Sequence, residues 1–547
     1  MIQEPIVRET PTVPPAKPDA SKPAVEEDVI AVENVQGNIG GFSKDFQRLL
    51  FFSITDPKKF KSCLGKLVGS IATMDEVLSF NRLFKRIRRR RGRECPTVQA
   101  TWINIAFSFG ALELLGAPDL GKFADKAFKQ GMAARAVDVL SDPASSAAEG
   151  NPGQWTSVKD PHVIVIIASD DEGDANFEAE FVLRTLGAGA TVIGEEIGRT
   201  LPGQLTGHEH FGFLDGVSQP GVRGRYADEP HALWTPRQNA NNPDQGKPGQ
   251  DLLWPGEFIF GYPGQDPSDK LTAGPNSLTG QGPEWAMDGS FFVFRKLRQA
   301  VGEFHSFVNS AAGQLGMSPD ELGARLVGRW RDGAPIMRSD TPNQALGDDD
   351  CANNNFEFRE DSEQVLSGDD GQCLDKVHPT SKADPDGKTC PFAAHIRKAY
   401  PRDDTSDSID GVGEDSTQTH RLLRRGIPFG AASASTLDKP VIGEVDGGRG
   451  LLFMCYQTSI EDGFEFVQRM WANNPTFANE LADKGGNGHD PIIGQTNENG
   501  RKRFIVIRHK GKETKLELPV DWIFTQGGGY FFSPSIAALG QLSKGFK

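Results

Sequence analysis

The chain has 547 residues, of which 37% are hydrophobic and 24% charged, fractions that are ordinary for a globular protein with a large core. The formal net charge of −15 argues against binding to nucleic acid or to an anionic membrane, because both partners require a positive surface. The six cysteines form no C-x-x-C pair, so neither a zinc site nor a dense disulfide framework is indicated.

Residues 1–34 predict a disordered leader, because they are rich in proline, alanine, lysine and glutamate and contain no aromatic side chain. They lack the apolar core of a signal peptide, and no apolar run approaches the length of a membrane span. The nearest N-glycosylation match, residues 474–476, is disqualified by its central proline. We therefore expect a cytoplasmic protein with no membrane partner; export by another route is the alternative.

Strands and helices alternate through the first half of the chain. A strand running into a glycine-terminated helix is expected at 101–116. The other expected elements are strands at 48–55 and 163–168 and helices at 60–67 and 176–186. Residues 221–285 are rich in proline, glycine and asparagine, and we interpret them as an extended insertion over a site.

The second half repeats this alternation. Strands are expected at 289–297 and 449–457, with helices at 303–311, 319–330 and 463–471. The repetition predicts an α+β fold of two domains, residues 35–220 and 286–547, each an α+β sandwich. Two such sandwiches facing each other would leave a cavity between them.

The stretch 205–222 has the highest density of site-type residues, with two histidines, an aspartate and four glycines in L-T-G-H-E-H-F-G-F-L-D-G-V-S-Q-P-G-V. The glycines let the backbone turn sharply and approach a ligand closely. Asp215 is flanked by Phe213, Leu214 and Val217. We therefore expect apolar surroundings that raise the pKa of Asp215 and fit it for proton transfer.

Two further segments could carry chemistry. His395 lies among small and apolar residues, which suits an axial haem ligand, although a histidine in such a segment is more often part of a core. Arg424 and Arg425 precede a tight turn, G-I-P-F-G. They could supply a fixed positive charge for an anionic intermediate, or simply form a surface pair.

Four motifs in this order resemble the dye-decolourising haem peroxidase family, in its long, fungal-type branch. The motifs are G-F-L-D-G (212–216), C-P-F-A-A-H-I-R-K (390–398), R-R-G-I-P-F-G (424–430) and R-G-L-L-F (449–453). The resemblance extends from about residue 35 to the C-terminus. It implies two ferredoxin-like α+β sandwich domains, duplicated as in a dimeric α+β barrel, with one haem b between them. An acidic insertion, 405–415, departs from the family pattern.

The resemblance also implies roles for individual residues. Asp215 corresponds to the distal acid, Arg424 to the distal arginine and His395 to the proximal iron ligand. The residues implied to surround the haem are Leu451 and Phe453 in the distal pocket, His210 near the haem edge, and Asp490, or more weakly Glu461, as acceptor of the proximal imidazole N–H.

The activity that the resemblance implies is peroxide-dependent oxidation. Hydrogen peroxide would oxidise the haem to a ferryl intermediate, which then takes single electrons from small to bulky aromatic donors such as dyes and phenolics. Trp471, with Tyr456 and Trp330 behind it, is a candidate relay from the surface for donors that are too large for the pocket. The alternative for Trp471 is an aromatic residue packed in the core.

Two other functions remain open from the residues alone. His208, His210 and Asp215 could hold a divalent metal for hydrolysis. Alternatively, the chain could be a haem-binding or iron-releasing carrier with little turnover, in which Asp215 and Arg424 would have no necessary role.

Overall fold

The computed structural model describes residues 30–42, 44–91, 97–224, 249–265, 275–278, 280–349, 352–362, 380–404, 417–443, 448–477 and 486–546. The expected leader up to residue 29 and the acidic insertion at 405–415 lie outside these ranges. Ile30 and Val32 are buried in the core. The packed structure therefore includes residues before the predicted boundary at 35.

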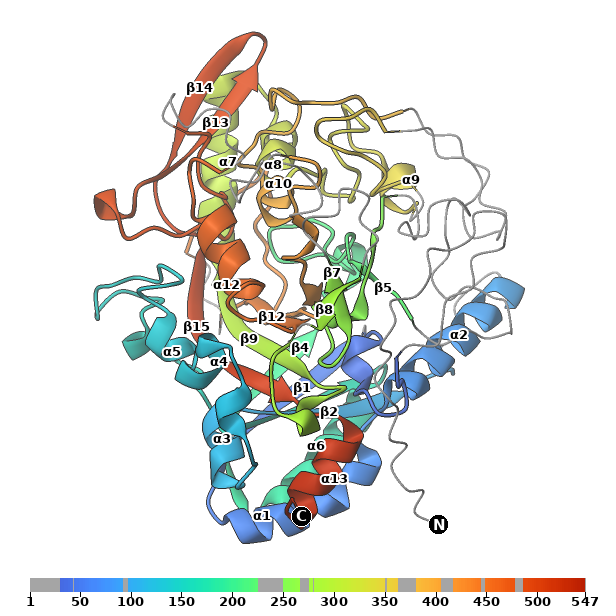
Figure 1. Cartoon of the computed structure of the whole chain (residues 1–547). Helices are drawn as coiled ribbons and strands as arrows, with labels where there is room; N and C mark the ends of the chain where they lie inside the picture. The colour runs from blue at the N-terminus through green and yellow to red at the C-terminus, as the bar shows by residue number, and fades with distance from the viewer. Residues whose placement is uncertain are drawn as a thin grey trace.

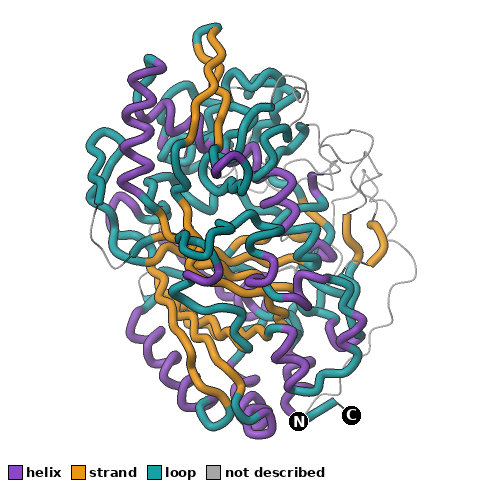
Figure 2. Tube along the Cα trace, turned by 90° about the vertical axis from the view of Figure 1, so that its left-hand side faces the viewer, coloured by secondary structure: helices purple, strands orange, loops and turns teal. Residues whose placement is uncertain are grey.

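One antiparallel sheet runs through the middle of the molecule (Figure 2). Its strand order is β10-β12-β9-β15-β2-β3-β1-β4, and β11 also pairs with β12. The nine strands are β1 (Phe46–Ile54), β2 (Thr101–Phe107), β3 (Val163–Ser169), β4 (Ala190–Arg199), β9 (Ser290–Gln299), β10 (Leu423–Arg424), β11 (Ile427–Phe429), β12 (Gly450–Gln457) and β15 (Ile523–Ser533).

The sheet consists of two halves that come from the two halves of the chain. Strands β1 to β4 form one half, and β9 to β12 with β15 form the other; they join where Phe532 of β15 pairs with Phe107 of β2. At the opposite edges, Ile427 of β11 packs against Gly198 of β4, so closely that a Cβ on Gly198 would lie 2.3 Å from Ile427 Cγ2. The sheet therefore curves back on itself, and the predicted α+β fold with two repeated halves is confirmed.

Alternating side chains give this sheet two apolar faces. Leu49 and Phe51 of β1 point inward, where the Phe51 ring lies 5.1 Å from the Phe294 ring of the other half. Leu50 and Phe52 point outward against helices. The inner face thus joins the two halves, and the outer face receives the helical layer.

Helices cover the outer face in two groups (Figure 1). At the base of the view, α1, α6 and α13 pack on the N-terminal half, whereas α7, α8 and α10 stand at the other end with the C-terminal half. The α-helices are α1 (Pro57–Leu67), α2 (Met74–Arg91), α3 (Phe109–Leu114), α4 (Lys126–Gln130), α5 (Met132–Arg135), α6 (Glu172–Leu186), α7 (Val301–Leu315), α8 (Pro319–Val327), α9 (Gln344–Gly347), α10 (His395–Ala399), α12 (Phe464–Phe466) and α13 (Ile536–Lys544).

The predicted helix at 463–471 has an unusual form. It is α12 followed directly by a π-helix, η8 (Val467–Ala472), a form that is frequent at functional sites. The remaining strands are β5 (Gly221–Val222), β6 (Leu252–Leu253), β7 (Pro263–Gln265), β8 (Pro275–Leu278), β13 (Arg503–His509) and β14 (Lys512–Leu518). The short 3-10 helices are η1 (Gly37–Ile39), η2 (Val68–Ser70), η3 (Leu120–Lys122), η4 (Pro152–Gln154), η5 (Gly203–Leu205), η6 (Pro255–Glu257), η7 (Glu284–Ala286) and η10 (Asn499–Arg501).

The segment 221–285 differs from the extended cover that we expected. Residues 225–248 and 266–274 of it lie outside the described ranges. In the described part, Phe258 and Ile259 are buried in the interior of the sheet, and Phe260 is buried against its outer face. Part of this segment is therefore core.

The thiols of Cys63, Cys390 and Cys455 are free and buried. Burial raises the pKa of Cys390 to about 12 and that of Cys455 well above its ordinary value. Cys95, Cys351 and Cys373 lie outside the described ranges. Among the helices of the described residues, none combines the length and apolar character needed to cross a membrane.

Candidate active site

A deep pocket lies on the outer face of the C-terminal half of the sheet. Its floor is apolar and comes from β9, β12 and β15, through Leu297, Leu451, Phe453 and Ile523. Its walls come from the 209–220 loop, α10, the 421–424 segment and η8. The pocket holds about 1590 Å³ of atom-free space, a figure that includes the open solvent at its mouth. Its apolar floor suits a ligand with an apolar face.

His395 begins α10 and faces this pocket with 26% of its side chain exposed. Its Nδ1 lies 2.8 Å from Oδ2 of the fully buried Asp490. Burial lowers the pKa of His395, but the charge and hydrogen bond of Asp490 outweigh it, so the pKa lies above its ordinary value. The pair with Asp490 fixes the ring and leaves Nε2 for a ligand in the pocket.

Asp490 is itself held from several sides. Its Oδ1 accepts hydrogen bonds from the backbone N–H groups of Ile492 at 2.8 Å and Ile493 at 3.0 Å. Burial raises the pKa of Asp490, yet His395 and these two N–H groups bring it below its ordinary value. Glu461, the weaker candidate for this role, instead accepts from the backbone of Lys126 at 2.8 Å.

The helix that carries His395 is anchored by its next basic residues. The fully buried guanidinium of Arg397 donates to Asp404 at 2.5 and 2.8 Å and lies 4.3 Å from the Phe392 ring. Lys398 Nζ donates to the carbonyl of Asn474 at 2.7 Å. These contacts fix a five-residue helix that could not hold its position alone.

Asp215 and Arg424 face the same pocket. Arg424 Nη1 lies 3.5 Å from Asp215 Oδ1, and its Nη2 donates to the Ser218 carbonyl at 2.9 Å. Asp215 Oδ1 also accepts from the N–H of Gly216 at 2.6 Å. The two side chains are 35% and 33% exposed. The apolar burial that we expected for Asp215 is therefore wrong.

Loop geometry explains this exposure. Gly212 and Gly216 have φ values of 89° and 73°, which side chains other than glycine rarely adopt. The turns direct Phe213 into the apolar cluster of α7 and α8, while Leu214 packs against Gly333. Asp215 is left to face the pocket, although its neighbours in sequence are apolar.

Sequence reasoning missed several other polar residues of the pocket wall. Glu209 accepts from the backbone N–H groups of Phe211 at 2.8 Å and Phe213 at 3.0 Å, and desolvation raises its pKa to about 7. The additional lining residues are Gln299, Arg329, Tyr400, Arg402 and Arg421. Arg402 and Arg421 flank the recognised motifs, and Glu209 lies between the two histidines of the 205–222 stretch, so all three could have been found from the sequence.

Arginines make part of the wall suitable for an anionic ligand. Burial and the nearby charges of Arg402 and Arg424 lower the pKa of Arg329 to about 9. Buried Nη1 of Arg402 has no hydrogen-bond acceptor within the described residues, and the Glu357 carboxylate lies 3.8 Å from it. A ligand with carboxylates could accept a hydrogen bond from this atom. If the ligand also had an apolar plane, that plane could pack on the apolar floor of the pocket.

His210 lies behind the pocket wall. It is buried, its Nε2 is 2.8 Å from the carbonyl of Phe429, and it is not among the residues that line the pocket. His208 Nδ1 lies 3.0 Å from the carbonyl of Thr206. In the part of the chain that the structure describes, no three His, Cys, Asp or Glu side chains gather as a metal site. The hydrolase alternative therefore lacks a site.

The aromatic residues expected to relay electrons are buried. Trp471 is 1% exposed; it stacks on Phe477 at 5.4 Å and meets the rings of His420 and Phe466 edge-on. Tyr456 points to the inner face of the sheet and pairs with Asn38, away from the pocket. Trp330 packs in a separate cluster beside Ala394. Trp471 is thus not a surface residue in the described structure.

Comparison with known proteins gives a consistent result. Residues 34–202 match the family model of the DyP dimeric alpha+beta barrel domain, and residues 359–483 match that of the C-terminal part of Dyp-type peroxidases. The chain is 32% identical over 534 residues to a dye-decolorizing peroxidase of Mycetinis scorodonius, covering 92% of this chain and 86% of that protein. The chain belongs to the dye-decolourising peroxidase family.

Solved structures of dye-decolourising peroxidases share its fold. An ancestral D-type dye-decolorizing peroxidase superposes with a TM-score of 0.71 at 33% identity, over 94% of this chain and 99% of that one. A peroxidase of Auricularia auricula-judae gives a TM-score of 0.68 at 29% identity, over 94% of this chain and all of that one. The duplicated α+β barrel predicted from the sequence is therefore confirmed.

Membership in the dye-decolourising peroxidase family makes the chain a haem-dependent enzyme. The pocket fits such a group: an imidazole available through Nε2, an apolar floor, and a buried arginine atom without an acceptor in the described residues all face one space. A carrier with little turnover is accordingly not favoured.

Proposed function

We propose that the chain binds one haem b in this pocket and uses hydrogen peroxide to oxidise aromatic donors. The observation that carries the proposal is that His395, backed by Asp490, lines the same pocket as the Asp215–Arg424 pair. His395 Nε2 would bind the haem iron, and the arginines of the wall would pair with the haem carboxylates.

The haem supplies the redox chemistry, and the side chains prepare the peroxide for it. Asp215 Oδ1 is held by Gly216 and Arg424, which leaves Oδ2 to take a proton from one peroxide oxygen and return it to the other. Arg424 stabilises the negative charge that develops as the O–O bond breaks. Its position is fixed because its backbone N–H donates to Gln219 and its Nη2 donates to Ser218.

Asp490 supports this chemistry from the Nδ1 side of the His395 ring, whereas Nε2 is left for the pocket. By accepting a hydrogen bond from Nδ1–H of His395, it makes Nε2 a stronger electron donor to a bound metal, which favours the oxidised state of that metal. It acts through His395, because it does not line the pocket itself. Asp490 is therefore a positioning residue in this proposal.

The function is tested with the haem-loaded protein and its absorbance spectrum before and after peroxide. We expect Asp215→Asn and Arg424→Leu to keep haem and to lose about 10²–10⁴-fold in the rate of the reaction with peroxide. The control is Asp320→Asn, since Asp320 pairs with Arg331 at 2.9 Å and does not line this pocket. An unchanged rate in both site variants would contradict the roles assigned to Asp215 and Arg424, and an unaltered protein whose haem absorbance does not respond to peroxide would favour a carrier.

Donors that are too large for the pocket require another route, and we propose Trp471 for it. The indole belongs to η8, whose Val467 and Gln468 line the pocket, and its ring neighbours Phe466 and His420 are partly exposed. We expect Trp471→Phe to reduce turnover of bulky dyes several-fold while sparing small donors, with Trp285→Phe as control. Unchanged dye turnover in Trp471→Phe would exclude the relay.

A further inference from the structure

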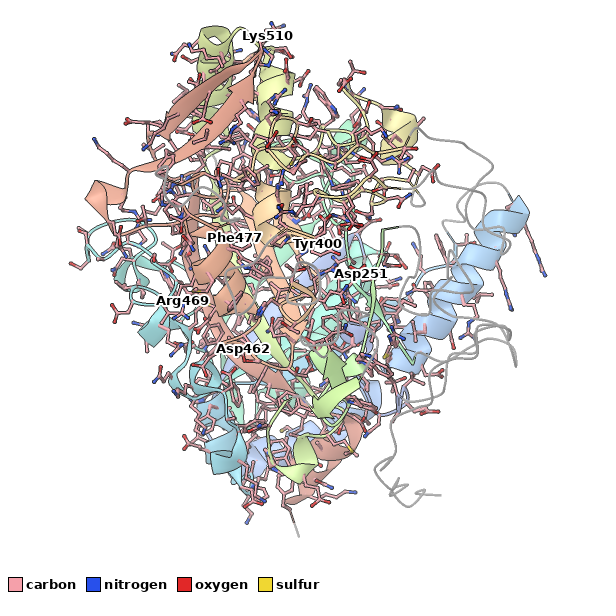
Figure 3. All side chains as sticks on the ribbon, turned by 45° about the horizontal axis from the view of Figure 1, so that its top comes forward. Asp251, Tyr400, Asp462, Arg469, Phe477 and Lys510 are labelled. Atoms are coloured by element: carbon pink, nitrogen blue, oxygen red, sulfur yellow. The ribbon has the colours of Figure 1, made fainter. Side chains whose placement is uncertain are left out.

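Tyr400 brings a phenol to the pocket directly after the helix of His395. Its hydroxyl donates to Oδ2 of Asp251, and the same oxygen accepts from Arg421 Nη1 at 2.7 Å. The Arg421 guanidinium lies 3.5 Å from the centre of the Tyr400 ring. Tyr400 and Asp251 come from distant parts of the chain and lie near each other in Figure 3.

Both partners of this contact are fixed. The Tyr400 N–H donates to the carbonyl of Ile396 at 2.9 Å, which ties it to α10, and the carbonyl of Asp251 accepts from Gly221 at 2.8 Å beside the β5–β6 pair. The contact could serve only to join α10 to this strand pair. However, Tyr400 and Arg421 also line the pocket, so the contact lies beside the proposed haem site and not only between α10 and the strand pair.

The arrangement suits removal of an electron from the phenol. A phenol loses an electron readily only if its proton leaves too, because the cation radical is a strong acid. Asp251 is in hydrogen-bond contact with that proton. Arg421, stacked on the ring, disfavours a positive charge there, and it also donates a hydrogen bond to the same Asp251 oxygen. Electron and proton would therefore leave together.

We propose that Tyr400 is a redox-active residue through which phenolic donors at the pocket mouth reduce the oxidised enzyme; this rests on the function proposed above. In the first step, Tyr400 gives one electron to the peroxide-oxidised centre and its phenolic proton to Asp251. In the second step, a phenolic donor gives one electron to the Tyr400 radical, Asp251 returns the proton, and the donor releases its own proton to water.

The test is electron paramagnetic resonance of the haem-loaded protein frozen within milliseconds of mixing with peroxide. We expect a tyrosyl radical signal that changes shape when ring-deuterated tyrosine is incorporated. Tyr400→Phe keeps the ring under Arg421 and removes only the hydroxyl, so the signal should be lost. The matched control is Tyr262→Phe, because Tyr262 also donates to a carboxylate, Asp288, but does not line the pocket.

Asp251→Asn tests the proton acceptor. We expect a much smaller tyrosyl signal at the same haem content, and slower reduction of the radical by phenols in D₂O than in H₂O for the unaltered protein. The isotope measurement needs no variant, so it stands even if Asp251→Asn does not fold. A signal that persists in Tyr400→Phe, or the absence of an isotope effect, would overturn the proposal.

The same measurements distinguish failure of the Tyr400 proposal from failure of the proposed peroxidase function. If peroxide changes the haem absorbance but no tyrosyl signal forms in the unaltered protein, Tyr400 is not redox-active and the peroxidase function stands. If haem does not bind, or peroxide leaves the absorbance unchanged, both proposals are overturned.

Discussion

The two halves of the sheet have the same architecture but differently covered outer faces. On the N-terminal half, Leu50 and Phe52 are buried under helices that contribute Leu64 and Val182. On the C-terminal half, part of the equivalent face, including Leu297 and Leu451, lines the pocket. The site therefore lies where the helical layer leaves part of the sheet uncovered.

The short elements over the C-terminal half explain the gap. α10 has five residues and α12 has three, and loops such as 209–220 fill the space between them. By contrast, α1 and α6 have eleven and fifteen residues and lie on the N-terminal half. The C-terminal half also has a long helix, α7, but the elements beside the pocket are short and anchored, and they hold His395 above the uncovered part of the sheet.

The largest effect on haem binding should come from removing the imidazole that faces the uncovered part of the sheet. We expect His395→Ala to abolish the haem absorption band, because no other imidazole among the described residues lines the pocket. His162→Ala is the control in the N-terminal half, where His162 Nδ1 accepts from the backbone of Ile54 at 3.0 Å. Haem binding that survives in His395→Ala would show that another residue is the ligand.

Two truncations compare the covered and open faces directly. Leu64→Ala, in the sealed core, should lower the free energy of unfolding by about 2–5 kcal/mol. Leu451→Ala should cost about 1 kcal/mol or less in the haem-free protein, because its side chain already faces open space. Denaturant unfolding measures both, and equal losses would contradict the difference between the faces.

The carboxylate beneath His395 gives a smaller effect. Asp490→Asn should weaken haem affinity about 10–100-fold, because the imidazole loses the charge that orients it and makes it basic. Transfer of haem to a scavenging protein measures the affinity. Glu461→Gln should leave it unchanged, and an equal effect of the two variants would argue against the assignment of Asp490.

Glu257, a buried carboxyl that does not line the pocket, should make the stability of the haem-free protein depend on pH. Burial raises the pKa of Glu257 to about 8. A raised pKa means that its stabilising contribution is complete below about pH 4.5 and is lost as pH rises through 8. Glu257→Gln should therefore be more stable than the unaltered haem-free protein at pH 8.5, by on the order of 1–3 kcal/mol, and not at pH 4. A pH-independent difference in unfolding would contradict this.

The sequence was sufficient to predict elements whose pattern is local. Val163–Ser169 is a continuous apolar run and forms the fully buried β3. Motif order was sufficient to select His395, Asp215 and Arg424, which the fold places around one pocket. These predictions rest on short stretches whose chemistry does not depend on distant partners.

Other features depend on contacts or turns that no local pattern reveals. β4 has an exposed burial pattern, and β15 contains Gly527, Gly528 and Gly529, so neither has the apolar alternation of a strand. The exposure of Asp215 follows from glycine turns that separate it from its neighbours. Tyr400 and Asp251 are 149 residues apart, and only the fold brings them together.

The buried thiols bear on how such an enzyme survives its own oxidant. Peroxide attacks the thiolate, and a thiol with a pKa of about 12, as at Cys390, is almost entirely protonated at neutral pH. Cys455 is similarly shielded, and Cys63 is also enclosed by apolar side chains. We therefore expect slow sulfenic acid formation at Cys390 and Cys455 during turnover, and burial also limits the access of peroxide to Cys63.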